Sequence, residues 1–146
     1  MKKKVFIKVV GTFAMAFAIM LNSGILTWAG GSIGSGTVRV GYDCVMTQAE
    51  TGLYRTTKNG GVLVKANSVY PVGNYDVDDY TKCWTMVYHH TIGNLPISAP
   101  VPLIEGEGYS EVEILDGYKQ LHYFDLCFSG NHPDYQAYVS YSYMGT

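Results

Sequence analysis

Beyond residue 30 the sequence alternates apolar and polar side chains with a period of two, and no segment there has the period of an amphipathic helix. The alternating segments are short, and Gly, Pro, Asn and Asp residues that favour turns separate them. The 13 Tyr residues strengthen this pattern, because aromatic side chains favour strands. The pattern predicts an all-β fold, a small antiparallel β-sandwich or β-barrel of about seven strands. The expected strands are Thr37 to Thr47, Leu53 to Thr57, Val62 to Ala66, Tyr80 to Thr91, Tyr109 to Leu115, Tyr118 to Phe128 and Tyr135 to Tyr143.

Three short segments between these strands are expected to be turns. Asn59-Gly60 is a strong hairpin signal, because both residues accept a positive φ, and it predicts that its two flanking strands pair with each other. Asp116-Gly117 predicts a second hairpin in the same way. The Gly, Asn and Pro of residues 130–134 predict a third turn, just before the last strand.

The N-terminal segment has the three parts of a secretory signal peptide. The first four residues carry three Lys, Val9 to Leu21 carries no charge, and Thr27-Trp28-Ala29 provides small residues ahead of a cut. We therefore expect residues 1–29 to be a cleaved signal peptide and the protein to be secreted. The alternative is an uncleaved anchor, with the membrane as a partner, because the charge-free stretch continues to residue 29 and is long enough to cross a bilayer.

The rest of the chain is expected to be a short lead and a single β domain, a layout that resembles many small exported bacterial proteins. Residues 30–36, Gly-Gly-Ser-Ile-Gly-Ser-Gly, have the composition of a flexible linker, and residues 37–146 form the domain. The whole chain has a net charge of −2, but four of its ten basic residues lie in the predicted signal peptide. The remaining six basic and twelve acidic residues give a net charge of −6. This charge argues against nucleic acid as a partner and against nonspecific attachment to anionic surfaces.

The mature chain contains three cysteines, Cys44, Cys83 and Cys127, each within an expected strand. An oxidising exterior favours one disulfide among them and leaves an odd thiol, while the sequence does not choose the pair. The alternative is that the cysteines are small buried apolar residues. Their wide spacing contains no CxxC signature of a redox or zinc site.

A calcium site is one interpretation of the segment that begins at Asn74. Asn74, Asp76 and Asp78 place oxygen ligands at every second position, as a calcium-binding loop does. The loop pattern then stops, because Asp79 replaces the Gly expected at the sixth position and Thr85 replaces the Glu expected at the twelfth. The other interpretation is an acidic, solvated turn. The sequence predicts no other cofactor.

The four histidines do not form a clear metal-binding motif. His89 and His90 are adjacent on an expected strand, so they point to opposite faces. His122 and His132 flank an expected turn and are predicted to approach each other. A zinc site needs three or four such ligands close together, so the alternative is that these are ordinary surface histidines.

The last expected strand assigns its side chains to two faces. Tyr135, Ala137, Val139, Tyr141 and Tyr143 form the face predicted to enter the core, and Gln136, Tyr138, Ser140, Ser142 and Met144 form the face predicted to meet water. An exposed Tyr suits flat recognition of sugars or proteins. Tyr138 is therefore the first candidate for ligand contact, together with Trp84.

These observations lead to three hypotheses about function. The first is a secreted, non-enzymatic β-sandwich that binds an extracellular or cell-envelope ligand through an aromatic surface. The second is a small secreted effector or antimicrobial protein. The third is a secreted hydrolase that uses Glu111 and Glu113, which share a strand face, or a Cys/His pair. The third hypothesis requires at least two ionisable groups within hydrogen-bond reach in a cleft.

Overall fold

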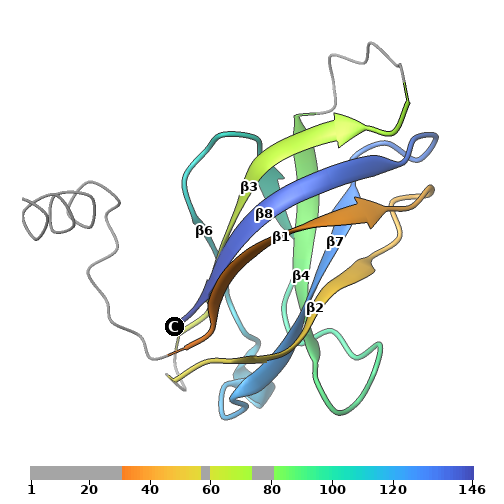
Figure 1. The fold of residues 1–146 in the computed structure, drawn as a ribbon. Coiled ribbons are helices and arrows are strands. Elements are labelled where there is room, and N and C mark those ends of the chain that lie inside the picture. Colours follow the sequence, from red (N-terminus) through yellow and green to blue (C-terminus); the bar gives the residue numbers. More distant parts are fainter. Residues whose placement is uncertain (1–30, 57–59, 74–80) are drawn as a thin grey trace, which may run out of the picture.

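The computed structural model describes residues 31–56, 60–73 and 81–146, and within them the chain forms two antiparallel sheets of four strands packed as a sandwich (Figure 1). The predicted all-β sandwich is confirmed, with eight strands in the described residues. The predicted signal peptide and the candidate calcium ligands Asn74, Asp76 and Asp78 lie outside these residues. In the described part of the chain, no helix is long and apolar enough to span a membrane.

The strands occur in the order β1-β8-β3-β6 in sheet A and β2-β7-β4-β5 in sheet B. This is the order of an eight-stranded jelly roll, in which every connection except that from β4 to β5 crosses between the sheets. The strands are β1 (Ile33–Val40), β2 (Thr47–Tyr54), β3 (Val62–Pro71), β4 (Lys82–His89), β5 (Val101–Ile104), β6 (Ser110–Val112), β7 (Tyr123–Gly130) and β8 (Ala137–Gly145).

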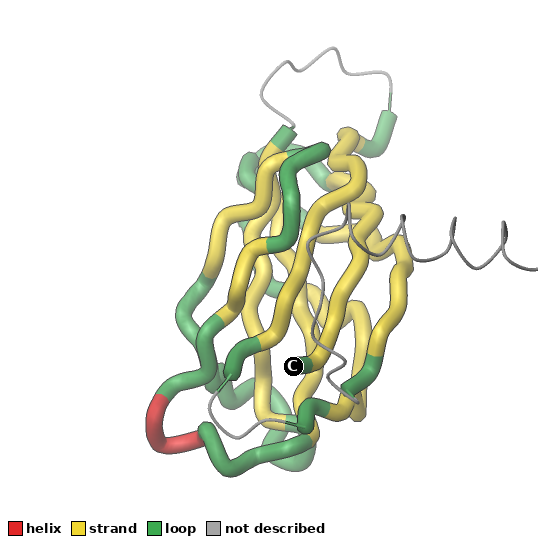
Figure 2. Tube along the Cα trace, turned by 90° about the vertical axis from the view of Figure 1, so that its left-hand side faces the viewer, coloured by secondary structure: helices red, strands yellow, loops and turns green. Residues whose placement is uncertain are grey.

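The two predicted hairpins are wrong, because the strands on either side of each turn belong to different sheets. β2 pairs with β7 while β3 pairs with β8 and β6, so the segment containing Asn59-Gly60 connects two sheets; Asn59 itself lies outside the described residues. Residues Asp116–Tyr118 form a short 3-10 helix, η1, at one end of the sandwich (Figure 2). Turn-forming residues favour reversal of the chain, but they do not determine which strand becomes the hydrogen-bonding partner.

The predicted flexible lead is wrong for residues 33–36, which form the first half of β1. The prediction of one strand from Thr37 to Thr47 is also wrong, because β1 ends at Val40 and β2 begins at Thr47. Between them, Asp43 and Cys44 both have a positive φ, which interrupts the extended backbone.

Glycine is required in β1 because tyrosine rings from β8 occupy the space where side chains would lie. A Cβ atom on Gly34 would lie 2.5 Å from the hydroxyl oxygen of Tyr143, and one on Gly36 would lie 2.5 Å from that of Tyr141. The glycines that make this segment resemble a linker are therefore required for the packing of β1, which is an edge strand.

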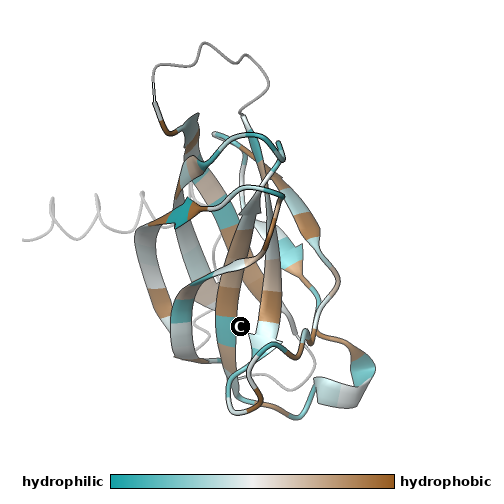
Figure 3. Cartoon of the chain, turned by 90° about the vertical axis from the view of Figure 1, so that its right-hand side faces the viewer, coloured by the Kyte–Doolittle hydropathy of each residue, from teal (hydrophilic) through white to brown (hydrophobic). Residues whose placement is uncertain are grey.

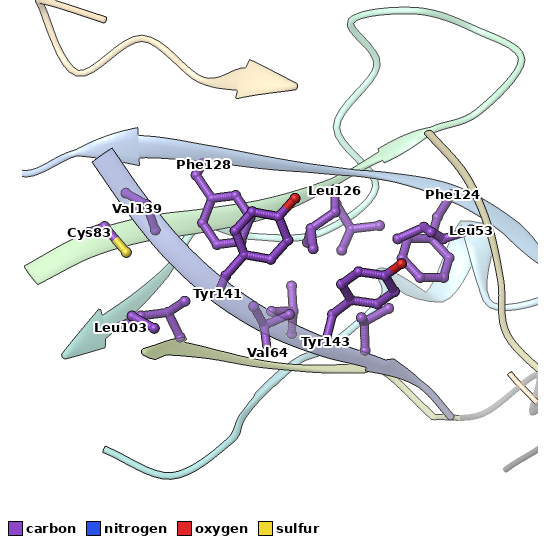
Figure 4. Close-up of a cluster of buried hydrophobic side chains, with 14 of the residues drawn as sticks. Leu53, Val64, Cys83, Leu103, Phe124, Leu126, Phe128, Val139, Tyr141 and Tyr143 are labelled. Atoms are coloured by element: carbon purple, nitrogen blue, oxygen red, sulfur yellow. The ribbon is translucent and has the colours of Figure 1, made fainter. Parts of the chain in front are cut away.

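The core lies between the two sheets and contains the apolar half of each alternating strand. Figure 3 shows hydrophobic and hydrophilic residues following one another along the strands. Phe124, Leu126 and Phe128 of β7 are buried, as predicted. The ring of Tyr141 stacks on the ring of Phe128 with 4.6 Å between centroids, and Figure 4 shows the two rings within the buried cluster. Such an aromatic pair adds about 0.5–1.5 kcal/mol to the stabilisation from burial alone.

The predicted faces of the last strand are confirmed over most of β8. Ala137, Val139, Tyr141 and Tyr143 are buried, and Tyr138, Ser140 and Ser142 are partly exposed. Met144 is an exception: it was predicted to meet water and is buried, 5% exposed. It lies in the row between Ile33 of β1 and Leu63 of β3, so its neighbours on both sides are apolar.

Candidate functional site

The outward side chains of β1, β8 and β3 form one continuous surface of sheet A, which we call the tyrosine face. Strand pairing arranges them in rows across the three strands. The surface is mostly polar, and hydroxyl groups fill its middle. Its exposed or partly exposed members are Ile33, Ser35, Thr37, Arg39, Leu63, Lys65, Asn67, Ser68, Tyr70, Tyr138, Ser140 and Ser142.

One end of the tyrosine face is a row of three large side chains. Tyr138 of β8 pairs with Arg39 of β1 on one side and with Tyr70 of β3 on the other. The rings of Tyr70 and Tyr138 lie 5.4 Å apart, and Tyr70 is 48% exposed. Arg39 donates a hydrogen bond from Nη2 to Oε1 of Gln136. The row thus presents two adjacent rings and a guanidinium group held beside them.

A β-bulge at Asn67 places Tyr70 in this row. Before the bulge Val64 and Ala66 point into the core, and after it Val69 does, so the inward positions shift by one residue. Tyr70 therefore points outward beside Tyr138. The side-chain nitrogen Nδ2 of Asn67 donates a hydrogen bond of 3.0 Å to the hydroxyl of Ser142. This bond holds the side chain of the bulged residue on the tyrosine face.

The tyrosine face has a different charge from the rest of this acidic protein. It carries two cations, Arg39 and Lys65, and the ammonium group of Lys65 lies 5.1 Å from the centre of the Tyr109 ring. Among the described acidic residues, Glu111 is the one that pairs into the outward rows of sheet A, at the far edge in β6. Glu105 also reaches the backbone of β3, where its Oε2 accepts a hydrogen bond of 3.1 Å from the Val69 amide. The rows of β1, β8 and β3 therefore carry both cations, and the nearby carboxylates lie along the outer edge of β3.

Trp84, the second predicted ligand-contacting residue, does not lie near Tyr138. It is on β4, where Cys83 and Thr85 are buried and Trp84 points to the outer side of sheet B. Its indole nitrogen donates a hydrogen bond of 3.2 Å to Oδ1 of Asn131. The two predicted contact residues lie on opposite outer surfaces of the sandwich and cannot contribute to one binding surface.

All three cysteines are free thiols in the structure. Cys83 points into the core, whereas Cys127 lies on the outer side of β7 opposite Met86. Cys44 is in the turn between β1 and β2. Burial raises the pKa of both the Cys83 and the Cys127 thiol to about 12, with the Asp125 charge as a second cause at Cys127.

A second cluster of polar side chains lies on the outer side of sheet B around Asp125. Oδ1 of Asp125 accepts hydrogen bonds from the Thr51 hydroxyl at 3.0 Å and the Gly52 amide at 2.9 Å. It also lies 2.8 Å from Nδ1 of His90. Gly52 has a positive φ of 66°, which turns its amide toward the carboxylate at the irregular pairing of β2 with β7. The side chain that carries this carboxylate is 11% exposed.

Beside this carboxylate is a hollow of about 90 Å³, which we call the Asp125 hollow. Asp125 and Cys127 line it from β7, together with Met46, Gln48, Tyr88, Gly93 and Asn94. The imidazole Nδ1 of His89 accepts hydrogen bonds of 3.1 Å from the amides of Thr91 and Ile92, which orders the turn that holds Gly93 and Asn94.

The cluster has the two neighbouring ionisable groups that the hydrolase hypothesis requires, but it lacks an activated nucleophile. His90 and Asp125 are two ionisable groups within hydrogen-bond reach beside a hollow. However, the raised pKa of Cys127 keeps its thiol protonated, and a thiol is a poor nucleophile compared with a thiolate. Glu111 and Glu113 are exposed, and Glu111 accepts a hydrogen bond of 3.2 Å from the Gly61 amide at the sheet edge. The geometry therefore does not assemble an activated nucleophile from these residues.

The predicted approach of His122 and His132 is wrong. They precede and follow β7 and therefore lie at its opposite ends, about 25 Å apart at the usual rise of an eight-residue strand. His122 contacts the carbonyl oxygen of Arg55 through Nδ1, at 2.9 Å. His89 and His90 have different hydrogen-bond partners: His89 accepts from the Thr91 and Ile92 amides, and His90 contacts Asp125. Within the described ranges no group of three His, Cys, Asp or Glu side chains is placed to hold a metal ion.

Comparison of the chain with protein-family models, with curated proteins and with solved structures finds no match.

Sequence reasoning missed Tyr70, Arg39 and the His90–Asp125 pair. Tyr70 and Arg39 were missed because only the bulge and the strand order place them beside Tyr138. Asp125 did carry a signal: it is the one acidic residue within the apolar run Tyr-Phe-Asp-Leu-Cys-Phe. A charged residue in such a strand is rarely buried unless it has partners, and here it has three.

Proposed function

We propose that the protein is exported and binds a cell-envelope glycan, without catalysing a reaction, through the tyrosine face. The observation that carries this proposal is the row of Arg39, Tyr138 and Tyr70 across three neighbouring strands. Export is supported by the charge pattern of residues 1–29.

The chemistry of the row suits the flat, polar surface of a sugar chain. The two neighbouring rings offer apolar area to the face of a sugar ring, and their hydroxyl groups remain available for hydrogen bonds. Rigid rings lose little conformational entropy on binding, which favours affinity. Arg39 adds several N–H donors for hydroxyl or carboxylate oxygens of the ligand.

The centre of the tyrosine face extends this site along the strands. Ser140 pairs with Thr37 on one side and with Ser68 on the other, so three hydroxyl groups lie side by side next to the aromatic row. These groups both donate and accept hydrogen bonds, as the hydroxyls of a glycan do. A chain of sugars laid along β8 would therefore meet rings first and hydroxyls next.

A cosedimentation experiment tests the proposal. The purified protein without residues 1–29 is mixed with insoluble cell-wall polysaccharide, and the bound fraction is measured for the wild type and for the double variant Tyr70→Ala and Tyr138→Ala. We expect the double variant to lose at least tenfold in affinity, since each ring contributes about 1 kcal/mol or more at a binding surface. Tyr42→Ala is the matched control, because Tyr42 is an exposed tyrosine (55%) in the turn after β1. Equal binding by the wild type and the double variant would overturn the proposal.

A further inference from the structure

We propose that the Asp125 hollow binds the ammonium group of a primary amine. This site lies on sheet B, on the opposite outer surface from the tyrosine face, and its argument does not depend on the glycan proposal.

The two oxygens of Asp125 have different surroundings. All three hydrogen-bond partners of the carboxylate contact Oδ1, and no donor from the described residues contacts Oδ2. The side chain of Asp125 is 11% exposed and lines the hollow. Oδ2 is not among the fully buried, unpaired polar atoms of the described residues, so it is open to the hollow and can accept a hydrogen bond from the occupant of the hollow.

The charge of the hollow favours a cationic donor over a neutral one. Of the residues that line it, Asp125 is the one with a charged side chain at neutral pH. Burial raises the pKa of the Cys127 thiol and of the Tyr88 phenol, so both stay protonated. A cation placed beside Asp125 therefore meets a carboxylate with no competing positive charge among the lining side chains.

The remaining lining residues match an ammonium group in chemistry and size. Gln48 and Asn94 carry amide oxygens that can accept the other N–H groups, and Tyr88 offers an aromatic ring for a cation–π contact. A cavity of about 150 Å³ holds benzene, so about 90 Å³ holds a group of a few non-hydrogen atoms, such as an ammonium with its first carbons. A whole sugar ring is too large.

The test is a titration of the ¹⁵N-labelled protein with n-butylammonium chloride, followed by NMR. The Gly52 amide is the reporter, because it donates directly to the carboxylate. We expect saturable shifts of Gly52 and of the amides around Cys127, with a dissociation constant in the millimolar range. Neutral n-butanol, and potassium chloride at the same ionic strength, are the control titrations. No saturable shift with n-butylammonium, or equal shifts with n-butanol, would overturn the proposal.

Two variants separate the site from nonspecific effects. Asp125→Asn can keep its Oδ1 acceptor for Thr51 and Gly52 while it turns an NH₂ group toward the hollow, so it should weaken n-butylammonium binding at least tenfold. Gly93→Leu adds bulk at the hollow, and because a Cβ there meets no atom within 4 Å, the fold should remain intact even if Asp125→Asn does not fold. It should weaken binding as well. Asp134→Asn, an exposed carboxylate, is the control that should bind as the wild type does. Unchanged binding by Gly93→Leu would contradict the location of the site.

Discussion

Tyr141 connects the two sheets of the sandwich through Glu50. Its ring lies in the core on Phe128, and its hydroxyl donates a hydrogen bond of 2.8 Å to Oε1 of Glu50, which belongs to β2 of the other sheet. Burial, followed by this bond, raises the pKa of the Tyr141 phenol well above its ordinary value. One side chain therefore combines core packing with a polar link at the edge where β1 and β2 face each other.

Substitution of Tyr141 should separate these two contributions. Tyr141→Ala removes the ring and should lower the free energy of unfolding by about 3–5 kcal/mol, whereas Tyr141→Phe removes only the hydrogen bond and should cost about 1–2 kcal/mol. Tyr138→Ala, on the outward face of the same strand, should cost less than about 1 kcal/mol. Urea unfolding of the three variants measures these values. A larger loss for Tyr138→Ala than for Tyr141→Ala would mean that the register of β8 is wrong.

A single methyl group in β1 should also disturb this contact. Gly36→Ala places a Cβ 2.5 Å from the Tyr141 hydroxyl oxygen, so we expect a loss of about 1–3 kcal/mol from overpacking. Gly41→Ala is the matched control: no atom lies within 4 Å of its added Cβ, and its effect should stay within about 0.5 kcal/mol. Thermal unfolding followed by circular dichroism compares the two. If residues 33–36 were a flexible lead, both substitutions would be neutral.

The sequence predicted which side chains point inward far better than it predicted which strands pair. A period of two reveals the buried face of β7 and β8 directly, because alternate residues point to opposite sides of a sheet. The partners of each strand depend on contacts between distant segments. Gly34 and Gly36 suggest a linker until Tyr143 and Tyr141, more than a hundred residues later in the chain, are placed against them.

In the candidate site, too, the direction of a side chain could be predicted from local alternation, whereas its neighbours on other strands could not. The outward position of Tyr138 follows from alternation within its own strand, whereas that of Tyr70 depends on the single bulged residue Asn67. Nothing in the local pattern of β3 marks that bulge. The contact between Asp125 and His90 similarly requires β4 and β7 to be neighbours in sheet B.

Alkaline pH should destabilise the protein through its buried thiols. Cys83 keeps its proton in the folded state to about pH 12, whereas it ionises near pH 9 once unfolded. Between these values the unfolded state binds fewer protons, so the free energy of unfolding falls as pH rises, and below pH 9 the contribution is fully present. The slope for one such proton is at most about 1.4 kcal/mol per pH unit. Urea unfolding between pH 8 and about 10 should show a shallower decline for Cys83→Ala than for the wild type. Parallel declines in the two proteins would exclude this role for Cys83.

Thiol reactivity should distinguish the three cysteines. In the native protein, a water-soluble disulfide reagent should react with Cys44, which is partly exposed, and spare the buried Cys83 and Cys127. After unfolding without a reductant, all three should react. Recovery of a single thiol from the unfolded monomer would instead show one disulfide, and the Cys44→Ser variant would then tell whether Cys44 is part of it.

NMR mapping of the glycan-bound protein tests the central proposal most directly. A soluble fragment of the cell-wall polysaccharide is titrated into the ¹⁵N-labelled protein, and the shifted amides are placed on the structure. We predict that the shifts concentrate on the outward rows of β1, β8 and β3, with the largest at Arg39, Tyr70 and Tyr138, and that the amides of sheet B stay unchanged. Saturable binding with its shifts on sheet B, or no binding at all, would contradict the assignment of the tyrosine face as the glycan-binding surface.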